Sequence, residues 1–370
     1  MLNDKNQGGP RKQPENALRR GWTTGACAAA GAGAAYHALI NGNFPKKAAV
    51  RLPGGQTPMF DLSTAELGDG YTVAGIIKDA GDDPDVTHGL EIITRVEPGP
   101  KGSGVQFMAG DGVGVITFPG LPVGVGEPAI NPGPRAMIIN ALKSEQTDVP
   151  DVLVTISVPG GKEVAQKTMN PRLGIKGGIS ILGTSGIVIP YSCSSWIHAI
   201  RQGIDVASEL GLEHLLAATG RTSESAANEI LNLSEQALID MGDFAGGMLK
   251  YLVTKKIKRI TIAGGFGKIS KLAQGEMDLH SSRSSVDVTK LAQMLEQLGA
   301  DKKIVDSAKK STTAAQILEI AGDMKSSLAS AVAKQAREVV MATLSGGVDV
   351  DIWIFDRNKN RLATSNQGQE

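Results

Sequence analysis

One segment near the start of the chain constrains the fold most strongly, because it consists almost entirely of alanine and glycine. The run ACAAAGAGAA follows Thr23, Thr24 and Gly25 and predicts a helix over about residues 25–40, with a threonine hydroxyl capping its free N–H groups. Each interior glycine costs such a helix about 1 kcal/mol relative to alanine. Two explanations remain open: tight packing on another backbone, or a ligand anion at the helix N-terminus.

Glycine is abundant beyond this helix, with 46 of 370 residues, and it concentrates in polar segments beside expected strand and helix ends. Lys plus Arg and Asp plus Glu each total 38, so the chain has no overall basic field for nucleic acid. We therefore expect no nucleic-acid partner. A small anionic ligand would have to be held by local arginines and backbone N–H groups.

The cysteine count and the hydropathy pattern indicate a cytoplasmic protein without a membrane partner. Cys27 and Cys193 lie far apart and form no paired motif, which favours a reduced compartment. No apolar run approaches the roughly 18 residues of a membrane span, and the polar N-terminus has no signal-peptide core. A homo-oligomer is possible on this sequence.

The order of expected elements predicts a mixed α+β and α/β fold. Short strands separated by Gly, Pro and Asp turns fill residues 47–158, with one helix beginning near Pro134, which favours a mainly antiparallel sheet. After Pro190 helices and strands alternate, which is typical of α/β crossovers and a partly parallel sheet. We expect a disordered tail over 1–17, an α+β domain with glycine-rich loops over 18–190, an α/β domain over 191–345, and a returning strand and C-terminal tail over 346–370.

Several common catalytic motifs are missing from the sequence. Gly267 and Lys268 are followed by Ile269, so no P-loop is formed, and a phosphoryl-transfer enzyme is disfavoured without being excluded. The chain also lacks G-x-S-x-G, H-E-x-x-H and paired C-x-x-C patterns, which removes the usual hydrolase and zinc signatures. We assign no metal site to the protein.

The most acidic segment, residues 78–89, directly follows an apolar strand and has the sequence KDAGDDPDVTHG. Its carboxylates and histidine have three open interpretations: a cation site, a general base or substrate-orienting group, or turn formation through side-chain hydrogen bonds to the backbone. Asp79 and His88 are the catalytic candidates of this segment.

Two Asn-Pro sequences with a nearby arginine predict sites for acidic groups. Asn131 and Arg135 stand at the start of the helix near Pro134, where a guanidinium and free N–H groups would point the same way. Asn170 and Arg172 precede a glycine-dense stretch. A surface arginine needs no such role, so both interpretations remain open for Arg135.

In the C-terminal part, two strands end in glycine-containing segments that we interpret as small flexible turns, ATGRTSE and AGGFGK. In open α/β sheets, ligands bind outside the carboxyl ends of strands, where glycine lets a cofactor approach the backbone. Gly220, Gly264 and Gly265 are the candidates. Asp243 follows the strand ALIDM and is either a favourable acid at a helix N-terminus or a contact for a ribose hydroxyl.

Several long strings occur together in a characteristic order, among them RRGWTTGACAAA, KDAGDDPDVTHG, GEPAINPGPRAMI, KTMNPRLGIKGGISILGTSGIV and MGDFAGGMLKY. Over roughly residues 19–357 the chain resembles the cobalt-precorrin-5B C1-methyltransferases of anaerobic cobalamin biosynthesis. The resemblance implies that S-adenosylmethionine donates a methyl group to C1 of a corrinoid macrocycle, giving cobalt-precorrin-6A, and that cobalt is present only as part of the substrate. The resemblance does not identify any catalytic residue in this sequence.

The resemblance and the residue pattern together give a hypothesis for the site. Asp79 or His88 would orient or deprotonate the macrocycle. The macrocycle would be bound by Thr23, Thr24, Asn131, Arg135, Asn170 and Arg172. The cofactor would be bound by Gly220, Asp243, Gly264 and Gly265. A corrinoid carrier without catalytic activity is the alternative, and binding of S-adenosylmethionine distinguishes the two.

Overall fold

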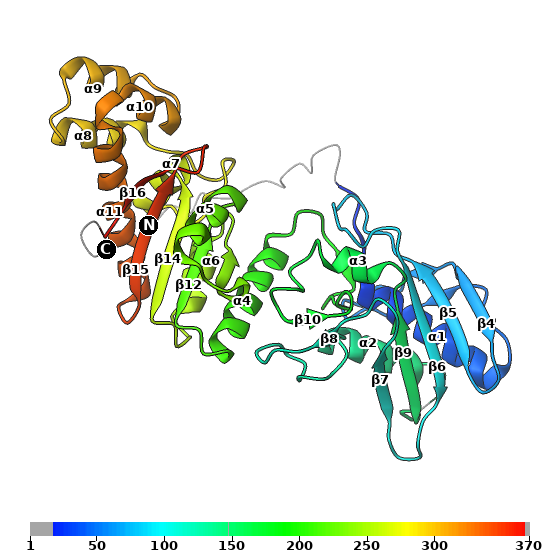
Figure 1. The fold of residues 1–370 in the computed structure, drawn as a ribbon. Coiled ribbons are helices and arrows are strands. Elements are labelled where there is room, and N and C mark those ends of the chain that lie inside the picture. The colour runs from blue at the N-terminus through cyan, green and yellow to red at the C-terminus, as the bar shows by residue number, and fades with distance from the viewer. Residues whose placement is uncertain (1–17, 147, 367–370) are drawn as a thin grey trace, which may run out of the picture. The chain divides into compact units, whose positions relative to one another are not determined.

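The computed structural model describes residues 18–146 and 148–366, so the tail expected over 1–17 lies outside the described residues. The chain divides into two compact units (Figure 1). Unit 1 takes in the described residues up to Val115, together with Gly126–Asn170 and Ile175–Ser192. Unit 2 takes in Ile116–Val125, Pro171–Gly174 and the described residues from Cys193 onward.

Unit 1 contains the expected mainly antiparallel sheet. Its five strands have the order β4-β5-β6-β9-β7, and every neighbouring pair is antiparallel except β7 and β9. These strands are β4 (Thr64–Leu67), β5 (Thr72–Ile77), β6 (Glu91–Pro98), β7 (Val105–Ala109) and β9 (Val152–Ser157). The shorter elements are β1 (Gly21–Trp22), β2 (Ala48–Ala49), β3 (Met59–Phe60), β8 (Val115–Ile116), α3 (Gly161–Ala165), β10 (Ile175–Lys176) and β11 (Ile187–Val188).

The alanine- and glycine-rich segment forms α1 (Thr24–Asn41), which contacts β5, β6 and α2 (Pro132–Lys143). Thr23 caps α1, accepting a hydrogen bond from the N–H of Ala26 at 3.2 Å. A Cβ added at Gly31 would lie 3.0 Å from Oγ1 of Thr94, and one at Gly33 would lie 3.4 Å from the Cβ of Ala141. Tight packing on the neighbouring strand β6 and helix α2 therefore accounts for the small residues of this helix.

Unit 2 is built around the expected partly parallel sheet, with the strand order β13-β12-β14-β15-β16. The first four strands are parallel, and β16 runs antiparallel to β15. The expected returning strand is β15, and it pairs with β14 along the full length of both. The bounds are β12 (His214–Ala218), β13 (Leu238–Asp240), β14 (Arg259–Gly265), β15 (Asp349–Phe355) and β16 (Arg361–Thr364).

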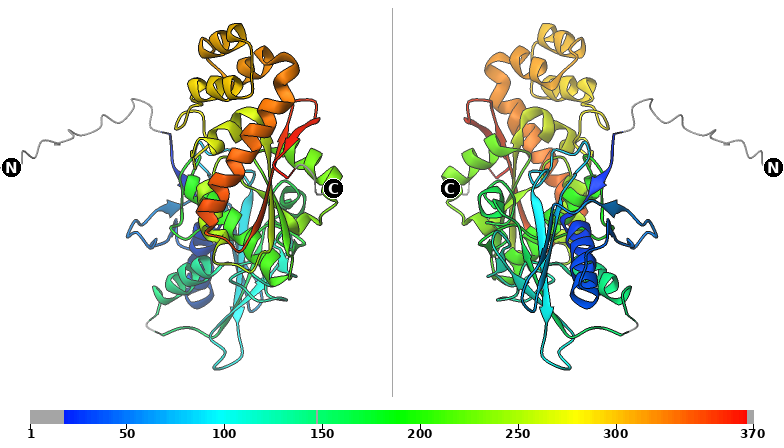
Figure 2. Two further views of the ribbon diagram at one scale, coloured as in Figure 1. Left: turned by 90° about the vertical axis from the view of Figure 1, so that its left-hand side faces the viewer. Right: turned by 90° about the vertical axis from the view of Figure 1, so that its right-hand side faces the viewer.

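Helices cover both faces of this sheet. One face packs on α5, and the other packs on α4, α6, α7 and α11, which share one large apolar core. Figure 2 shows α11 as the long orange helix beside the sheet, and Figure 1 shows α8, α9 and α10 grouped at the end of unit 2. The bounds are α4 (Cys193–Glu209), α5 (Arg221–Leu231), α6 (Ala245–Leu252), α7 (Phe266–Ala273), α8 (Val288–Gln297), α9 (Lys302–Lys309), α10 (Ala314–Ile320) and α11 (Lys325–Leu344), with 3-10 turns at Glu235–Ala237 and Gly322–Met324.

One local expectation in this unit is wrong. The segment AGGFGK is not a flexible turn, because β14 continues through Gly265 and α7 begins at the next residue, Phe266. The parallel partner strand extends β14 to this point, since Gly264 and Gly265 pair with Ile354 and Phe355. Among the described residues, the helices include none with the length and apolar character needed to cross a bilayer.

Candidate functional site

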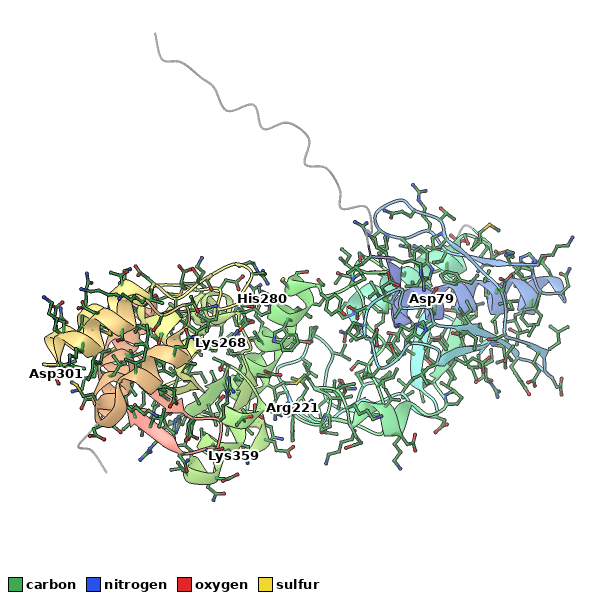
Figure 3. All side chains as sticks on the ribbon, turned by 90° about the horizontal axis from the view of Figure 1, so that it is seen from above. Asp79, Arg221, Lys268, His280, Asp301 and Lys359 are labelled. Carbon is green, nitrogen blue, oxygen red and sulfur yellow. The ribbon has the colours of Figure 1, made fainter. Side chains whose placement is uncertain are left out.

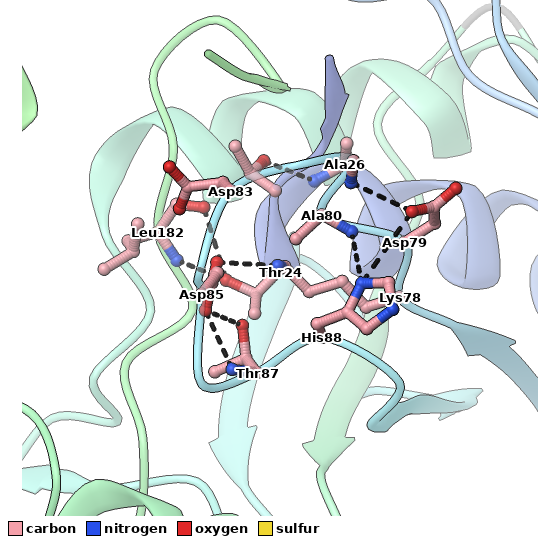
Figure 4. Close-up of polar contacts among 12 residues, drawn as sticks. Thr24, Ala26, Lys78, Asp79, Ala80, Asp83, Asp85, Thr87, His88 and Leu182 are labelled. Carbon is pink, nitrogen blue, oxygen red and sulfur yellow. Dashed lines mark hydrogen bonds and ion pairs between the residues drawn. The ribbon is translucent and has the colours of Figure 1, made fainter. Parts of the chain in front are cut away.

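The acidic segment after β5 forms a loop around a buried lysine (Figure 4). The side chain of Lys78 is 1% exposed, and its Nζ lies 2.7 Å from a carboxylate oxygen of Asp85. The other oxygen of Asp85 accepts hydrogen bonds from the N–H and the hydroxyl of Thr87, at 2.8 and 2.6 Å. Burial disfavours the charged carboxylate, but the nearby ammonium and these hydrogen bonds outweigh it, so the pKa of Asp85 is lowered.

The other carboxylates of this loop also bind groups of the fold. Asp82 accepts a hydrogen bond from the N–H of Arg19 at 2.6 Å, and Asp83 accepts one from the N–H of Tyr191 at 2.9 Å. The described residues contain no group of three or more His, Cys, Asp or Glu side chains arranged to hold a metal ion. The arrangement therefore favours turn formation over a cation site for these acids.

Asp79 and His88 lie together in this loop. Both carboxylate oxygens of Asp79 pair with the guanidinium of Arg19, and one also accepts the N–H of Gly81 at 2.9 Å. The Arg19 hydrogen bond, with the Gly81 N–H, lowers the pKa of Asp79 to about 2, which makes it a weak base. Nδ1 of His88 lies 3.8 Å from Asp79 and accepts the N–H of Ala80 at 3.1 Å, which leaves Nε2 to carry the proton.

The N-termini of α1 and α2 both contact one segment, residues 181–186. The hydroxyl of Thr24 accepts the N–H of Leu182 at 3.0 Å, and the N–H of Gly25 donates to the carbonyl of Leu182 at 3.1 Å. At α2, the N–H of Asn131 donates to the carbonyl of Ile181 at 3.0 Å. The sequence candidates Thr23, Thr24 and Asn131 are thus brought together, but the N–H groups of Gly25, Ala26 and Cys27 at the start of α1 already have protein partners.

Two other unit 1 candidates are used by the fold itself. Nε of Arg135 donates to the carbonyl of Ile130 at 2.8 Å, and its guanidinium pairs with Glu127 at 3.1 Å. Asn170 is 7% exposed, and its amide donates to the carbonyl of Gly178 at 3.0 Å. These contacts close loops beside the two helix N-termini. Asn131 differs, because its side chain makes no capping hydrogen bond.

Arg172 belongs to unit 2 rather than to the unit that contains Asn170. Its two terminal nitrogens bind the two carboxylate oxygens of Glu224, in the first turn of α5, at 2.9 and 2.6 Å. This bidentate ion pair raises the pKa of Arg172. The guanidinium is thereby committed to a protein carboxylate.

The carboxyl ends of β12 and β14 lie at a topological switch point of the unit 2 sheet. From β12 the chain passes through α5 to β13 on one side, and from β14 it goes on to β15 on the other side. The helices that follow the two strands, α5 and α7, lie on opposite faces. Ligands of open α/β sheets bind at such points, outside the carboxyl ends of the strands.

Three glycine candidates lie at this switch point. Gly220 is the N-cap residue of α5, and Gly265 ends β14. A Cβ added at either position would meet nothing within 4 Å, so both face open space. Gly264 differs, because a Cβ there would lie 2.9 Å from both Ile269 and Thr219. Two of the three glycines therefore leave room for a ligand at the backbone.

Asp243 lies close to these strands but has a protein partner. Its carboxylate forms an ion pair with Lys268 of α7, and the same ammonium donates to the carbonyl of Leu279 at 3.0 Å (Figure 3 labels Lys268). The backbone carbonyl of Asp243 accepts the N–H of Leu279 at 2.8 Å. This carboxylate anchors the segment that follows α7.

Two charged residues beside these candidates are not among those that the sequence singles out. Lys78 directly follows the apolar strand β5, and a lysine next to such a run is a signal for a buried partner. Asp240 ends β13, where it pairs in register with Ala218 of β12. An acidic residue about 20 positions after a glycine at a strand-to-helix turn is the available signal for this second residue.

Comparison with known proteins identifies relatives over nearly the whole chain. The chain is 52% identical over 366 residues to the cobalt-precorrin-5B C(1)-methyltransferase of Brucella anthropi, covering 98% of this chain and 100% of the relative. It is 54% identical over 347 residues to the protein of the same name from Paramagnetospirillum magneticum, covering 93% and 97%.

A crystal structure of the cobalamin biosynthesis protein cbiD from Archaeoglobus fulgidus is 30% identical in sequence, covers 72% of this chain and 83% of that chain, and has a TM-score of 0.39. A family model described as CbiD matches residues 11–190, and one described as CbiD, C-terminal domain matches residues 278–366. With both models matched and relatives more than half identical along its length, the chain belongs to the CbiD family.

Proposed function

We propose that the protein is a methyltransferase that methylates C1 of cobalt-precorrin-5B, giving cobalt-precorrin-6A in corrin ring biosynthesis. The observation that carries this proposal is the identity of 52% and 54% to proteins named for that activity, over 98% and 93% of the chain. The proposal includes S-adenosylmethionine as methyl donor, the corrinoid as a small-molecule substrate, and action in the cytoplasm.

Methyl transfer of this kind needs placement more than acid–base groups. S-adenosylmethionine supplies an electrophilic methyl group on a sulfonium centre. A carbon–carbon bond forms from the electron pair of C1, while the electrons of the carbon–sulfur bond remain on sulfur, so S-adenosylhomocysteine is released and the macrocycle takes up the positive charge. In-line positioning of the two reactants supplies much of the rate in such a step.

The switch point of unit 2 is the proposed binding place of the adenosyl ligand. Gly220 and Gly265 leave open space at the ends of adjacent parallel strands, and α5 begins directly after Gly220. The positive end of a helix favours electron-rich groups nearby. These features support a ligand that lies along the backbone with little side-chain contact.

In unit 1 the proposed contacts with the macrocycle come from side chains that the fold leaves available. Asn131 makes no capping hydrogen bond, and His88 is exposed with its Nδ1 already occupied. Thr24, Arg135 and Asn170 contribute by holding the neighbouring loops. Asp79 holds Arg19 and the turn at Gly81 and acts through position rather than as a base.

The test is turnover with a labelled donor. Purified protein, cobalt-precorrin-5B and S-adenosylmethionine carrying a labelled methyl group should yield a macrocycle heavier by one labelled methyl, with an equal amount of S-adenosylhomocysteine. Binding of the macrocycle without methylation, and without binding of S-adenosylmethionine in calorimetry, would instead identify a corrinoid carrier. Gly265→Ala serves as the cofactor-site variant, since the fold has room for the added methyl group.

A further inference from the structure

We propose that Asp240 accepts hydrogen bonds from the ribose hydroxyls of the adenosyl ligand. This inference rests on the proposed function, because it takes the switch point of unit 2 as the place of that ligand. It assigns the ribose contact to a residue other than Asp243, the residue that the sequence pattern suggests.

Asp240 lies at the end of the strand beside the one that leads into Gly220. Asp240 is the last residue of β13 and pairs with Ala218, the last residue of β12. The N–H of Gly242 donates to the carbonyl of Ala218 at 3.1 Å, which keeps the two strand ends together beyond the ladder. Neighbouring strands lie about 4.8 Å apart, so Asp240 is one strand away from the chain that leads into Gly220.

The side chain of Asp240 lies on the same face of the sheet as α5. Residues alternate between the faces of a strand, so Asp240 shares its face with Leu238. Leu238 packs in the core between the sheet and α5, whereas Ile239 packs in the core on the opposite face. Asp240 is therefore on the α5 face, where the negative charge of Glu224, in the first turn of α5, acts on it. In nucleotide-binding α/β folds, an acidic residue of this kind binds the ribose while the glycine turn faces the rest of the ligand.

The charges around Asp240 do not favour its ionised form. Burial, together with the negative charge of Glu224, raises the pKa of Asp240, so the ionised carboxylate is disfavoured here. The positive charges of Arg172 and Arg221 act in the opposite direction without reversing this shift, and the guanidinium of Arg172 forms its ion pair with Glu224. Keeping this half-buried carboxylate ionised reduces the stability of the fold, and the backbone of Gly220 nearby is accessible. Such a group is typical of a ligand-binding site rather than of a contact that stabilises the fold.

Asp243 is less suited to this role. Its carboxylate is committed to Lys268, which a ribose hydroxyl would have to displace. Breaking that ion pair would also release the ammonium that holds the carbonyl of Leu279. Among the described residues no ion pair holds Asp240, so a ribose hydroxyl would displace none there, and the N–H of Gly242 also acts on this carboxylate.

The experiment measures ligand binding by calorimetry on the full chain. The two probes are S-adenosylhomocysteine and its analogue lacking both ribose hydroxyls. The unmodified protein should bind the analogue about tenfold or more weakly, because each charge-assisted hydrogen bond is lost. Asp240→Asn should bind both probes alike, at about the affinity of the unmodified protein for the analogue, and should unfold at or above the parent temperature. Asp349→Asn, at the amino end of β15 and separated from β12 by β14, is the matched control and should preserve the discrimination.

Each other outcome overturns the inference in a distinguishable way. Discrimination that persists in Asp240→Asn would assign the ribose elsewhere and leave the proposed function standing. Equal weakening of both probes with a lower unfolding temperature would make Asp240 a structural residue. Failure of the unmodified protein to bind either S-adenosylhomocysteine or S-adenosylmethionine would overturn the proposed donor and this inference together.

Discussion

The ammonium of Lys78 lies 2.7 Å from the carboxylate of Asp85, and the lysine side chain is almost fully enclosed while that of Asp85 is a quarter exposed. The pair joins the end of β5 to the loop that carries Asp79 and His88. A buried charge with one protein counter-ion depends strongly on that partner, because its hydration has been lost on folding.

We expect Asp85→Asn to destabilise the protein by about 3 kcal/mol, since it leaves the ammonium of Lys78 without its counter-ion. Lys78→Met with Asp85→Asn should recover much of the loss, because no buried charge remains. Urea unfolding of the parent protein and the two variants measures both effects. A double variant as unstable as Asp85→Asn alone would show that the hydrogen bonds to Thr87, rather than the ion pair, matter most.

The same carboxylate predicts a pH dependence. The pKa of Asp85 is lower in the folded protein than in the unfolded chain, so its ionised form stabilises the fold. That contribution is fully present above the unfolded pKa of about 3.9 and is lost as the pH falls through the folded pKa. The stability difference between the parent and Asp85→Asn should therefore shrink in acid. A difference that stays constant down to pH 3 would contradict this sign.

Glycines at the switch point should respond differently to the same small change. Gly265→Ala and Gly220→Ala place a methyl group in open space, so the unfolding temperature should stay near that of the parent while S-adenosylhomocysteine binds more weakly. Gly264→Ala brings a Cβ within 2.9 Å of Ile269 and Thr219 and should cost about 1–3 kcal/mol of stability. Thermal unfolding measures the effect on stability, and calorimetry measures the effect on binding. Unchanged affinity for S-adenosylhomocysteine in both Gly220→Ala and Gly265→Ala would show that the ligand binds at another place.

Two glycines of α1 should change the stability of the protein in opposite directions when each is replaced by alanine. Gly33→Ala adds a methyl group at ordinary contact distance from Ala141 and should stabilise the protein by about 0.5–1 kcal/mol, through helix propensity. Gly31→Ala should destabilise it by about 1 kcal/mol, because the added atom crowds the hydroxyl of Thr94, which donates to the carbonyl of Ala28. Denaturant midpoints measure both. An equal increase in stability from both substitutions would show that Thr94 can shift to accommodate the added methyl group.

The two cysteines should differ sharply in reactivity. Cys27 is fully buried in α1, and burial raises the pKa of its thiol to about 12, so it forms almost no thiolate at neutral pH. Cys193, at the start of α4, is partly accessible. A thiol reagent should modify one equivalent in the native protein and two after denaturation. Peptide mapping should place the native modification at Cys193, and labelling of Cys27 at a comparable rate would contradict the packing of α1.

Much of the fold could be predicted from the sequence, because its main elements carry strong patterns. The alternation in β6 and β9 and the apolar runs of β12 and β14 identified their strands directly. The strands β4 and β7 were not predicted. β4 is exposed along most of its length, and β7 alternates only between partly buried and exposed positions, so neither shows the apolar alternation of a strand with one buried face. Glycine density suggested a turn at 264–267, where pairing with β15 maintains a strand.

The candidate site was harder to predict, because residue type does not reveal a side chain's partner. Arg135 and Arg172 have the chemistry of an anion site, but one binds backbone carbonyls and the other binds Glu224. Glu224 lies 52 residues after Arg172, whereas the partners of Arg135 are only five to eight residues away but depend on the path of the loop before α2. Residue type alone indicates neither set of contacts. Gly220 and Gly265 could be placed near strand ends from the sequence, and the role proposed for them depends only on that position.

The pairing of β15 with β14 has a consequence for how unit 2 is completed during synthesis. More than 80 residues separate the two strands, so β14 keeps an open edge of backbone donors and acceptors until Asp349–Phe355 leaves the ribosome. An apolar strand with an open edge is a template for pairing with other chains. A nascent or shortened chain that stops before β15 should therefore depend on chaperones to remain unaggregated, even though every residue proposed here to contact the adenosyl ligand has already been made.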